Sequence, residues 1–342
     1  MRLAFALILA IAAHALGQGS GERLHLALPT DNDALLKEGG AAFYQYIIRD
    51  YQGVITKPWQ GGQYGFVRNP VETPAGLIYT RFHEGMDIRP VHRNTAGEPL
   101  DEVRAIADGT VVYTNLVPAH SNYGNYVVVE HRWGGANYYS LYGHLASVRV
   151  RSGATVQRGQ QLGVMGYTGE GLDRERAHVH LELNLLLGRQ FDSWYNVYNK
   201  AEPNYHGLYN GINLSGIDIA RLYLALRKEP SLTIPRFLAQ EQTFYRVALP
   251  ASKSLDLVRR YPWLSQTKGD AQLAWEISFN RAGVPLKVEH TDKAVSVPTL
   301  SFVKKQAGDY AILTRGIVGG SGDSAHLTEN GERLMRLFVW AE

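Results

Sequence analysis

Residues 177–183, Ala-His-Val-His-Leu-Glu-Leu, are the part of this chain from which its fold and chemistry are best predicted. They belong to a stretch, 178–187, whose composition and alternation predict a β-strand. Residues two apart on a strand point to the same face, so His178, His180 and Glu182 share one face and the apolar residues between them point into the core. Two neighbouring imidazoles suit a metal site, although two solvent-facing histidines on an edge strand would give the same pattern.

A second candidate for metal binding lies in residues 81–88, Arg-Phe-His-Glu-Gly-Met-Asp-Ile. His83 and Asp87 are four apart, which would place them on one face of a helix. Gly85 argues against a helix, so a turn leading into a strand at Asp87 is predicted instead. The stretch also begins like the H-E-x-x-H motif, but position 87 is aspartate and no helix is expected, so Glu84 is predicted to be an ordinary surface residue.

A third motif, Leu-Tyr-Gly-His-Leu at 141–145, adds His144 to the candidate residues. Zinc is readily bound by imidazole nitrogen and carboxylate oxygen. Three protein ligands with the fourth position left for water are typical of catalytic zinc, whereas structural sites are closed. The chain contains no cysteine, which excludes both a thiolate zinc site and any disulfide.

The three motifs occur in the order H-x-x-x-D, Y-x-H-L and H-x-H, and in this the chain resembles the lysostaphin-type zinc endopeptidases of peptidoglycan, the LytM family. The resemblance extends over about residues 80–187, roughly a third of the chain. It also includes the text that connects the motifs, namely 107–111 (Ala-Asp-Gly-Thr-Val), 124–128 (Gly-Asn-Tyr-Val-Val), 153–160 (Gly-Ala-Thr-Val-Gln-Arg-Gly-Gln) and 166–169 (Gly-Tyr-Thr-Gly).

The resemblance implies a role for each matching residue. His83, Asp87 and His180 match the ligands of one zinc ion, and His144 and His178 match two unligated catalytic histidines. It also implies a mainly β fold, an antiparallel β-sheet peptidase core with a groove along its face and the zinc at the groove floor. Some relatives have lost ligands and serve as binding partners of other enzymes, but this chain keeps all five positions.

The function expected from this resemblance is that of a zinc metalloendopeptidase acting on peptide cross-links or bridges of bacterial peptidoglycan. Zinc lowers the pKa of a bound water toward about 7 and polarises the scissile carbonyl, and the two histidines would move the protons. Glu182 either orients a ligand imidazole or is a solvated strand residue. Two rival functions stay open: a catalytically silent wall-binding activator of another hydrolase, and a secreted zinc protease acting on Gly-rich proteins.

The N-terminus has the pattern of a cleaved signal peptide, predicted over residues 1–17. Arg2 precedes an apolar run, 3–13, and two small-x-small sites follow it, ending at Ala15 and Gly17. The run is shorter than the about 20 apolar residues that a membrane span needs. An uncleaved anchor and a buried N-terminal helix are the alternatives. The sequence therefore predicts a periplasmic or secreted protein without a stable membrane anchor after cleavage.

The remaining chain is divided into three parts by its patterns. Residues 18–75 are expected to form a helical and loop segment, with one helix at 31–50 and a Gly-rich loop at 52–65, and this segment could occlude the groove. Residues 76–195 are expected to be the zinc peptidase domain, with strands in 105–114, 125–132, 137–145, 156–164 and 178–187.

Residues 196–342 are expected to form a C-terminal α+β domain of unknown role. Its predicted elements are helices at 216–228 and 255–260, a strand pair at 272–279 and 284–290, a strand at 309–317, and a closing helix or strand at 332–340.

Charge and side-chain types limit the partners. The formal net charge of +3 is too small to argue for nucleic acid, and the expected partner is a peptidoglycan peptide. Further candidates for the groove lining, each of which could equally be an ordinary surface, core or strand residue, are His120, Tyr123, Asn125, His131, Tyr139 and Tyr167.

Overall fold

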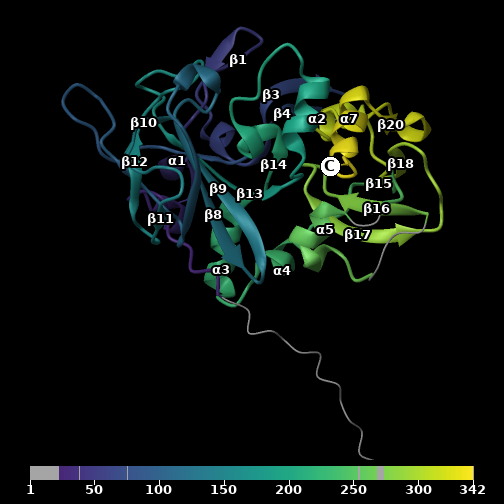
Figure 1. The fold of residues 1–342 in the computed structure, drawn as a ribbon. Helices are drawn as coiled ribbons and strands as arrows, with labels where there is room; N and C mark the ends of the chain where they lie inside the picture. Colours follow the sequence, from purple (N-terminus) through teal and green to yellow (C-terminus); the bar gives the residue numbers. More distant parts are fainter. Residues whose placement is uncertain (1–22, 38, 75, 253–254, 268–272, 342) are drawn as a thin grey trace, which may run out of the picture.

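The computed structural model describes residues 23–341 except 38, 75, 253–254 and 268–272 (Figure 1). The predicted signal peptide, 1–17, lies outside the described residues. None of the helices in the described part of the chain has the length and apolar character needed to cross a membrane.

The main sheet places the site, and within the described residues it has seven antiparallel strands (Figure 1). Both β5 and β14 pair with the same edge of β13, so this strand is enclosed on both sides. The antiparallel, mainly β core predicted from the sequence is confirmed. The strands are β11 (Thr155–Val156), β7 (Gly109–Asn115), β8 (Tyr126–Trp133), β9 (Ala136–Gly143), β13 (Val179–Leu186), β14 (Leu214–Gly216) and β5 (Met86–Ile88).

Smaller sheets flank this one. A three-stranded sheet has the order β10 (Leu145–Val148), β12 (Gln161–Met165) and β6 (Glu102–Arg104). The predicted strand stretch 156–164 thus contributes to two sheets. Two hairpins precede the main sheet in the sequence, β1 (Arg49–Tyr51) with β2 (Val54–Thr56), and β3 (Gly65–Thr73) with β4 (Gly76–His83).

The helix predicted at 31–50 is wrong. In its described residues, 31–37 and 39–50, this stretch contains only a 3-10 turn, η1 (Ala34–Leu36), and a single helical turn, α1 (Gly40–Phe43), before it becomes extended. The backbone at Gly39 has φ +83°, outside the range of a right-handed helix, so the helix pattern is interrupted there. The apolar residues that suggested a helix, such as Phe43, are buried against the core instead.

The Gly-rich stretch 52–65, predicted as loop, is partly ordered. It contains β2 and the 3-10 turn η2 (Trp59–Gly62). The Trp59 ring stacks on Tyr44 with ring centroids 5.9 Å apart. Tyr44 in turn forms a β-bridge with Ile88 of β5, so the stacked pair attaches this stretch to the peptidase core.

Most of the predicted C-terminal elements are confirmed. The two helices are α3 (Ile219–Lys228) and α5 (Asp256–Arg260), and the strand pair is β16 (Ala274–Phe279) with β17 (Pro285–Thr291). The strand predicted at 309–317 is wrong, because Asp309 accepts a hydrogen bond from Ala311 N and starts the short helix α6 (Tyr310–Leu313). The closing element is a helix, α7 (Glu329–Leu337), which Thr328 caps.

Other elements complete this part of the chain. Strand order in its sheet is β17-β16-β15-β18. The remaining helices and strands are α2 (Phe191–Tyr198), α4 (Ile234–Leu238), β15 (Tyr245–Pro250), β18 (Thr299–Val303), β19 (Val318–Gly319) and β20 (His326–Leu327). The 3-10 turns are η3 (Pro118–His120), η4 (Gly207–Tyr209), η5 (Gly211–Asn213), η6 (Pro262–Leu264) and η7 (Gly322–Ser324).

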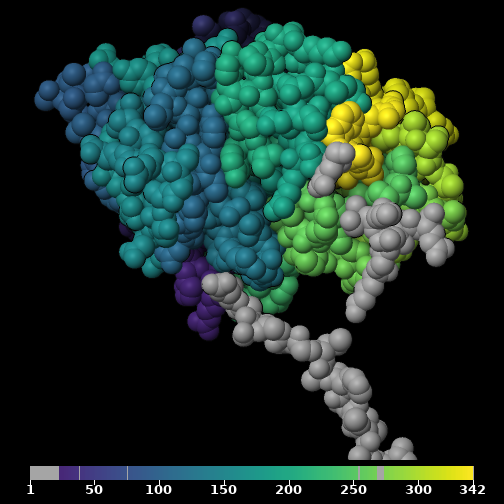
Figure 2. All heavy atoms as spheres, in the orientation of Figure 1, coloured from purple at the N-terminus to yellow at the C-terminus, as the bar shows by residue number. Residues whose placement is uncertain are grey.

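One cluster of buried apolar side chains continues from the main sheet into the C-terminal elements. Tyr261 is part of the junction, because Leu186 N donates to its hydroxyl at 2.9 Å and its ring centroid lies 5.7 Å from that of Tyr138. Figure 2 shows the C-terminal residues, green to yellow, packed directly against the strand-rich part. The division of the chain at residue 195 stays a prediction.

Candidate active site

The register of β13 brings the histidines and the aspartate together. His180 is paired with Asp87 of β5 on one side and with Gly143 of β9 on the other. His144 follows Gly143 directly, so it lies beside His180 as well. The turn from β4 to β5 requires glycine at position 85, because a Cβ there would lie 2.3 Å from the carbonyl oxygen of Leu181.

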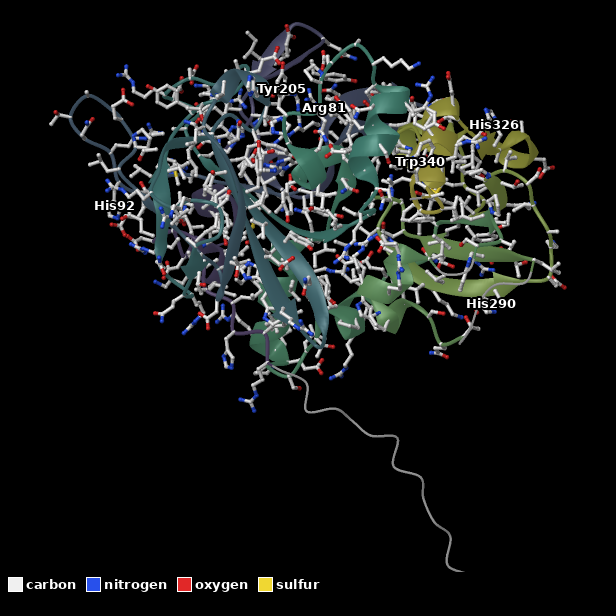
Figure 3. The ribbon with its side chains drawn as sticks, viewed as in Figure 1. Arg81, His92, Tyr205, His290, His326 and Trp340 are labelled. Atoms are coloured by element: carbon white, nitrogen blue, oxygen red, sulfur yellow. The ribbon has the colours of Figure 1, made fainter. Side chains whose placement is uncertain are left out.

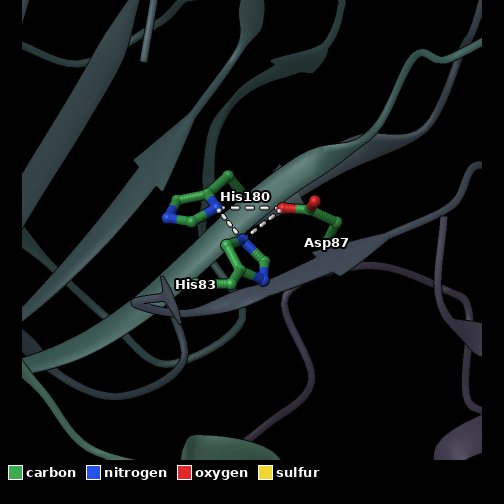
Figure 4. A group of neighbouring side chains, drawn as sticks. All are labelled: His83, Asp87 and His180. Carbon is green, nitrogen blue, oxygen red and sulfur yellow. Dashed lines mark hydrogen bonds and ion pairs between the residues drawn. The ribbon is translucent and has the colours of Figure 1, made fainter. Parts of the chain in front are cut away.

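Three ligand atoms converge at the end of β4 (Figure 4). His83 Nε2 lies 3.1 Å from His180 Nδ1 and 3.1 Å from Asp87 Oδ1, and His180 Nδ1 lies 2.9 Å from the same Oδ1. All three side chains are buried. A tetrahedral zinc ion with bonds of about 2.0–2.2 Å holds its ligand atoms roughly 3.3–3.6 Å apart, so a small outward shift of the side chains would admit one.

In the imidazoles of His83 and His180, the nitrogen that faces away from Asp87 has a hydrogen-bond partner. This partner shows which nitrogen of each neutral ring holds the proton. His83 Nδ1 lies 2.8 Å from Gln63 O, and His180 Nε2 lies 2.8 Å from Glu182 Oε1. A carbonyl and a carboxylate oxygen only accept, so both outer nitrogens donate. In the neutral rings the two inner nitrogens then have lone pairs directed at Asp87 Oδ1. In this neutral form three converging acceptors repel one another unless a cation lies between them, either the second proton that His180 otherwise holds or a metal ion, and this donor set fits zinc.

The second oxygen of Asp87 is held by an arginine from the N-terminal hairpin. Arg68 Nη2 donates to Asp87 Oδ2 at 2.6 Å, and Arg68 Nε donates to Gly61 O at 2.8 Å. Burial opposes the ionisation of Asp87, but the adjacent imidazoles of His83 and His178 and the Arg68 guanidinium hold its pKa well below the usual range. Asp87 is therefore a carboxylate at neutral pH.

The two ligand histidines differ in proton affinity. Burial lowers the pKa of His83. Burial also acts against protonation of His180, but its hydrogen bonds to Asp87 and Glu182 outweigh this and raise its pKa to about 10. A proton shared between these carboxylates competes with a metal ion for the same lone pair, so metal binding must release it.

Glu182 is buried, with 1% of its surface exposed, so the alternative of a solvated strand residue is wrong. Its Oε1 accepts from the Tyr123 hydroxyl at 2.7 Å, and its Oε2 accepts from Asn184 Nδ2 at 2.9 Å. Because these partners immobilise the carboxylate, Glu182 orients the His180 ring and determines which of its nitrogens is free.

His144 and His178 form a second pair beside the three ligand atoms. Their ring centroids are 4.6 Å apart, and His178 Nε2 lies 3.4 Å from Asp87 Oδ1. His144 Nδ1 donates to Thr168 O at 2.8 Å, and His178 Nδ1 donates to Arg176 O at 2.6 Å. In both rings the Nε2 atom is therefore the one left to exchange protons. Burial, together with the neighbouring imidazoles, holds the pKa of His144 well below its usual value.

The backbone at His144 is in the left-handed region, with φ +62°. A non-glycine residue in this region costs about 1 kcal/mol or more and is common at functional sites. The His144 N–H donates to Tyr123 O at 2.7 Å, which helps to hold this conformation.

A cleft of about 1380 Å³ opens over these five residues. One wall comes from β3 and β4, with Arg68 and Arg81, and Arg315 of the C-terminal part also lines it. The cleft is also lined by the stacked rings of His120 and Tyr205, whose centroids are 4.0 Å apart.

The predicted groove residues are only partly confirmed. Tyr123 and His120 line the cleft. Those predicted residues that do not line it have other contacts: His131 is buried and bonded to Asp108 O, Asn125 donates to Leu145 O, Tyr139 is buried, and Tyr167 donates to Glu98.

Glu84 is not the ordinary surface residue that the sequence predicted. It lines the cleft, and Arg315 Nη2 donates to its Oε1 at 2.9 Å. Arg68, Arg81 and Arg315 were missed by sequence reasoning, since nothing in their local sequence marks them. Only the strand register and the packing of the C-terminal part bring them to the cleft.

Comparison with known proteins agrees with this geometry. Residues 81–193 match the family model described as Peptidase family M23. The peptidoglycan DD-endopeptidase ShyA of Vibrio cholerae serotype O1 is 41% identical over 91 residues, which are 25% of this chain and 20% of that protein. The cell division protein DipM of Caulobacter vibrioides is 34% identical over 100 residues, which are 29% of this chain and 14% of that protein.

Among solved structures, the catalytic domain of the antimicrobial peptidase lysostaphin from Staphylococcus simulans is 26% identical and has a TM-score of 0.24, covering 36% of this chain and 82% of that one. The chain spans a fifth or less of the length of the two curated relatives. The matched range includes both histidine pairs and Asp87. The chain therefore contains a peptidase family M23 domain, over residues 81–193.

Proposed function

We propose that this protein is an exported zinc metalloendopeptidase that hydrolyses peptide bonds in bacterial peptidoglycan. The observation that carries the proposal is the convergence of His83 Nε2, Asp87 Oδ1 and His180 Nδ1 at the floor of an open cleft. The family M23 match and the similarity to a peptidoglycan DD-endopeptidase support it.

Each of the five residues has a role in this proposal. His83, Asp87 and His180 hold one zinc ion, which when bound would activate a water molecule and polarise the scissile carbonyl. In both His144 and His178, Nδ1 donates to a backbone carbonyl and Nε2 is left to exchange protons. One of them takes the proton of the attacking water, and the other gives a proton to the leaving amine.

The proposed setting follows from the sequence. A signal peptide over residues 1–17 would direct the protein to the periplasm or the medium, where peptidoglycan is found. The peptidase domain is proposed to span 76–195 and the C-terminal α+β domain 196–342. For the bond that is cut, the name of the relative ShyA favours a D-Ala cross-link over a glycine bridge.

The test is digestion of purified peptidoglycan sacculi by the zinc-loaded protein. We expect soluble muropeptides with cut cross-links, and their masses identify the bond. His180→Ala should lose both bound zinc and activity, while the control His326→Ala, at an exposed histidine outside the cleft, should lose neither. A zinc-loaded protein that releases nothing from sacculi, both as the wild type and with substitutions in the β1–β2 hairpin that would relieve occlusion of the cleft, would refute the proposal.

The second candidate function is a catalytically silent activator of another wall hydrolase, which the similarity to DipM, a cell division protein, brings into consideration. Retention of all five site residues favours catalysis instead. The same assay separates the two functions, because an activator would bind sacculi without releasing muropeptides. A Gly-rich protein offered as substrate beside sacculi tests the third possibility, a protease of Gly-rich proteins.

The N-terminal segment was predicted as a possible occluding element, and this stays a prediction. The segment supplies Gln63 and Arg68, which contact His83 and Asp87. Removing the whole segment would therefore disturb the metal site, so a deletion is a poor test of latency. Point substitutions in the β1–β2 hairpin keep these contacts and are the better experiment.

A further inference from the structure

A single arginine stands on the strand face that leads to the metal site. Arg81 and His83 are two apart on β4, so their side chains leave the same face of the strand. Their Cα atoms are roughly 7 Å apart at about 3.4 Å per residue. An extended peptide lying along β4 with its scissile bond at His83 would reach Arg81 about two residues away.

The register of the hairpin adds a second arginine directly opposite. Arg68 of β3 is paired with Arg81 of β4, and both line the cleft. Figure 3 marks Arg81 in the same part of the molecule as Tyr205, which also lines the cleft. Like charges at directly opposite positions destabilise an antiparallel pair. Asp87 compensates the charge of Arg68, so the guanidinium of this pair that stays without a counter-charge is that of Arg81.

The other arginines that line the cleft have hydrogen-bond or ion-pair partners, and Arg81 differs from them in this respect. Arg68 is bonded to Asp87, Arg315 to Glu84, and Arg176 to Gly171 O. Within the described residues, Arg81 has no ion pair or hydrogen bond to an acidic side chain. Because the carboxylates of Glu84 and Asp87 are bonded to other arginines, the Arg81 guanidinium can take an anion from outside the protein.

The same strand face is partly covered next to Arg81. Tyr79, two residues further from His83, is half-buried under Arg49, whose guanidinium carbon lies 4.9 Å from the centre of the Tyr79 ring. Arg49 Nη2 also donates to Val67 O at 3.1 Å. Arg81 is therefore the exposed position of this face that lies nearest His83.

We propose that Arg81, with Arg68 beside it, binds a free carboxylate of the stem peptide about two residues from the bond that is cut. The inference rests on the proposed function and names a substrate feature that the cleft selects. Stem peptides carry such carboxylates at a C-terminal D-alanine and on residues joined through a side chain. A guanidinium is suited to them, because its planar fork forms two parallel hydrogen bonds with a carboxylate.

The experiment compares two soluble cross-linked peptide substrates that differ only in one group, a free carboxylate or its amide at this position. We expect the full-length zinc-loaded protein to prefer the acid about tenfold or more in kcat/KM, since a hydrogen bond to a charged group contributes on this scale. Arg81→Gln should remove the preference by raising KM for the acid, with kcat within about twofold. Arg81→Lys should keep part of it, because the charge stays but the fork is lost.

The control is Arg132→Gln, an exposed arginine of β8 that does not line the cleft and should leave the preference unchanged. Thermal unfolding serves as a second readout. Arg81→Gln should unfold at the same or a higher temperature, because it removes the like-charge pair. Equal acid preference in Arg81→Gln and the wild type would overturn the inference.

Failure of the proposed function can be told apart from failure of this inference. If the wild type cuts neither peptide, the function fails, and calorimetric binding of the acid and the amide then tests Arg81 alone. Tighter binding of the acid that Arg81→Gln abolishes would still support the carboxylate site. Equal binding of both peptides to the wild type would contradict it.

Discussion

Arg68 illustrates how much a single residue outside the recognised motifs contributes to the site. It holds Asp87 Oδ2 at 2.6 Å while Oδ1 is directed at the two ligand histidines. Its guanidinium both orients the carboxylate and helps to keep it ionised. Residues that orient a metal ligand in this way are often as important for affinity as the ligand itself.

We therefore predict that Arg68→Ala lowers zinc affinity by about 10- to 100-fold, because Asp87 loses its orienting partner. Competition with a chromogenic chelator measures the affinity. Arg132→Ala is the matched control. A variant that folds and binds zinc as tightly as the wild type would show that Arg68 does not position Asp87.

His144 combines a proposed catalytic role with a backbone in the left-handed region. We predict that His144→Asn reduces turnover of peptidoglycan by at least about a hundredfold, the usual contribution of a general acid or base. Zinc content should stay unchanged. The melting temperature should not fall on account of the backbone, because asparagine tolerates the left-handed φ of +62° well. Turnover close to that of the wild type would remove His144 from the mechanism.

At the scale of elements, β13 and its neighbours explain why the site is preorganised. All eight residues of β13 are buried, including the polar His180, Glu182 and Asn184. Neighbouring strands on both edges satisfy its backbone, so the strand cannot slip by one residue without burying its polar face in the core. The position of His180 relative to Asp87 and His144 is thus determined by strand pairing.

A buried polar chain joins β8 and β9 at the other end of the sheet. His131 Nδ1 lies 2.8 Å from Asp108 O, and His131 Nε2 lies 2.7 Å from Ser140 Oγ. The Ser140 hydroxyl is 3.0 Å from that of Tyr142, which accepts from Ile106 N at 2.8 Å. Burial lowers the pKa of His131 to about 4.

The pH dependence of stability follows from that shift. Because folding lowers the pKa of His131, the unfolded chain binds the proton at a higher pH than the folded protein does. The stabilisation is therefore complete above pH 6.5, the ordinary value, and is lost as the pH falls toward 4. We predict that His131 alone reduces the free energy of unfolding by about 3 kcal/mol over that range.

Urea unfolding of the wild type and of His131→Gln at pH 7 and pH 4 measures this contribution. The stability difference between them should shrink by about 3 kcal/mol at the lower pH, since glutamine does not titrate. His326→Gln, at an exposed position, should follow the wild type at both pH values. A pH-independent difference for His131→Gln would contradict the prediction.

At the scale of the whole molecule, the C-terminal part is built into the peptidase core. β14, an edge strand of the main sheet, comes from residues 214–216, beyond the predicted domain boundary. Arg260 Nη2 donates to Leu187 O at 2.9 Å, and Trp194 Nε1 donates to Arg333 O at 2.8 Å. The beginning, the middle and the end of the C-terminal part therefore all contact the peptidase core.

We predict that a chain ending at Tyr195 loses its cooperative thermal transition, because the main sheet loses β14 and the core loses the Tyr261 side chain. Circular dichroism and size-exclusion chromatography of the truncated and full-length proteins test this. The full chain should unfold in one transition that zinc shifts upward. A soluble, monomeric fragment with the melting temperature of the full protein would instead establish a separate peptidase domain.

The sequence by itself determined the strands of the peptidase core and the five candidate residues, because both depend on short-range patterns. Alternation with period two predicted β13, and spacing within two motifs made His83 with Asp87 and His178 with His180 candidates for metal binding. The resemblance added the assignment of three ligands and two catalytic histidines, His144 among them, and the reaction. Predictions from local sequence patterns were wrong where long-range packing determines the structure. In the stretch 31–50, the apolar residues pack against the core without forming a long helix.

Only the tertiary structure decided what surrounds those five residues. From the sequence, a buried and a solvent-exposed Glu182 were both possible. The structure shows it buried, because strands pair with both edges of β13. The register of the β3–β4 hairpin places Arg68 opposite Arg81. Arg315 contacts Glu84, although more than two hundred residues separate them in the sequence. The physical reason is that a side chain's partner is set by which strands pair and which surfaces pack, and neither is encoded within a few residues of the side chain itself.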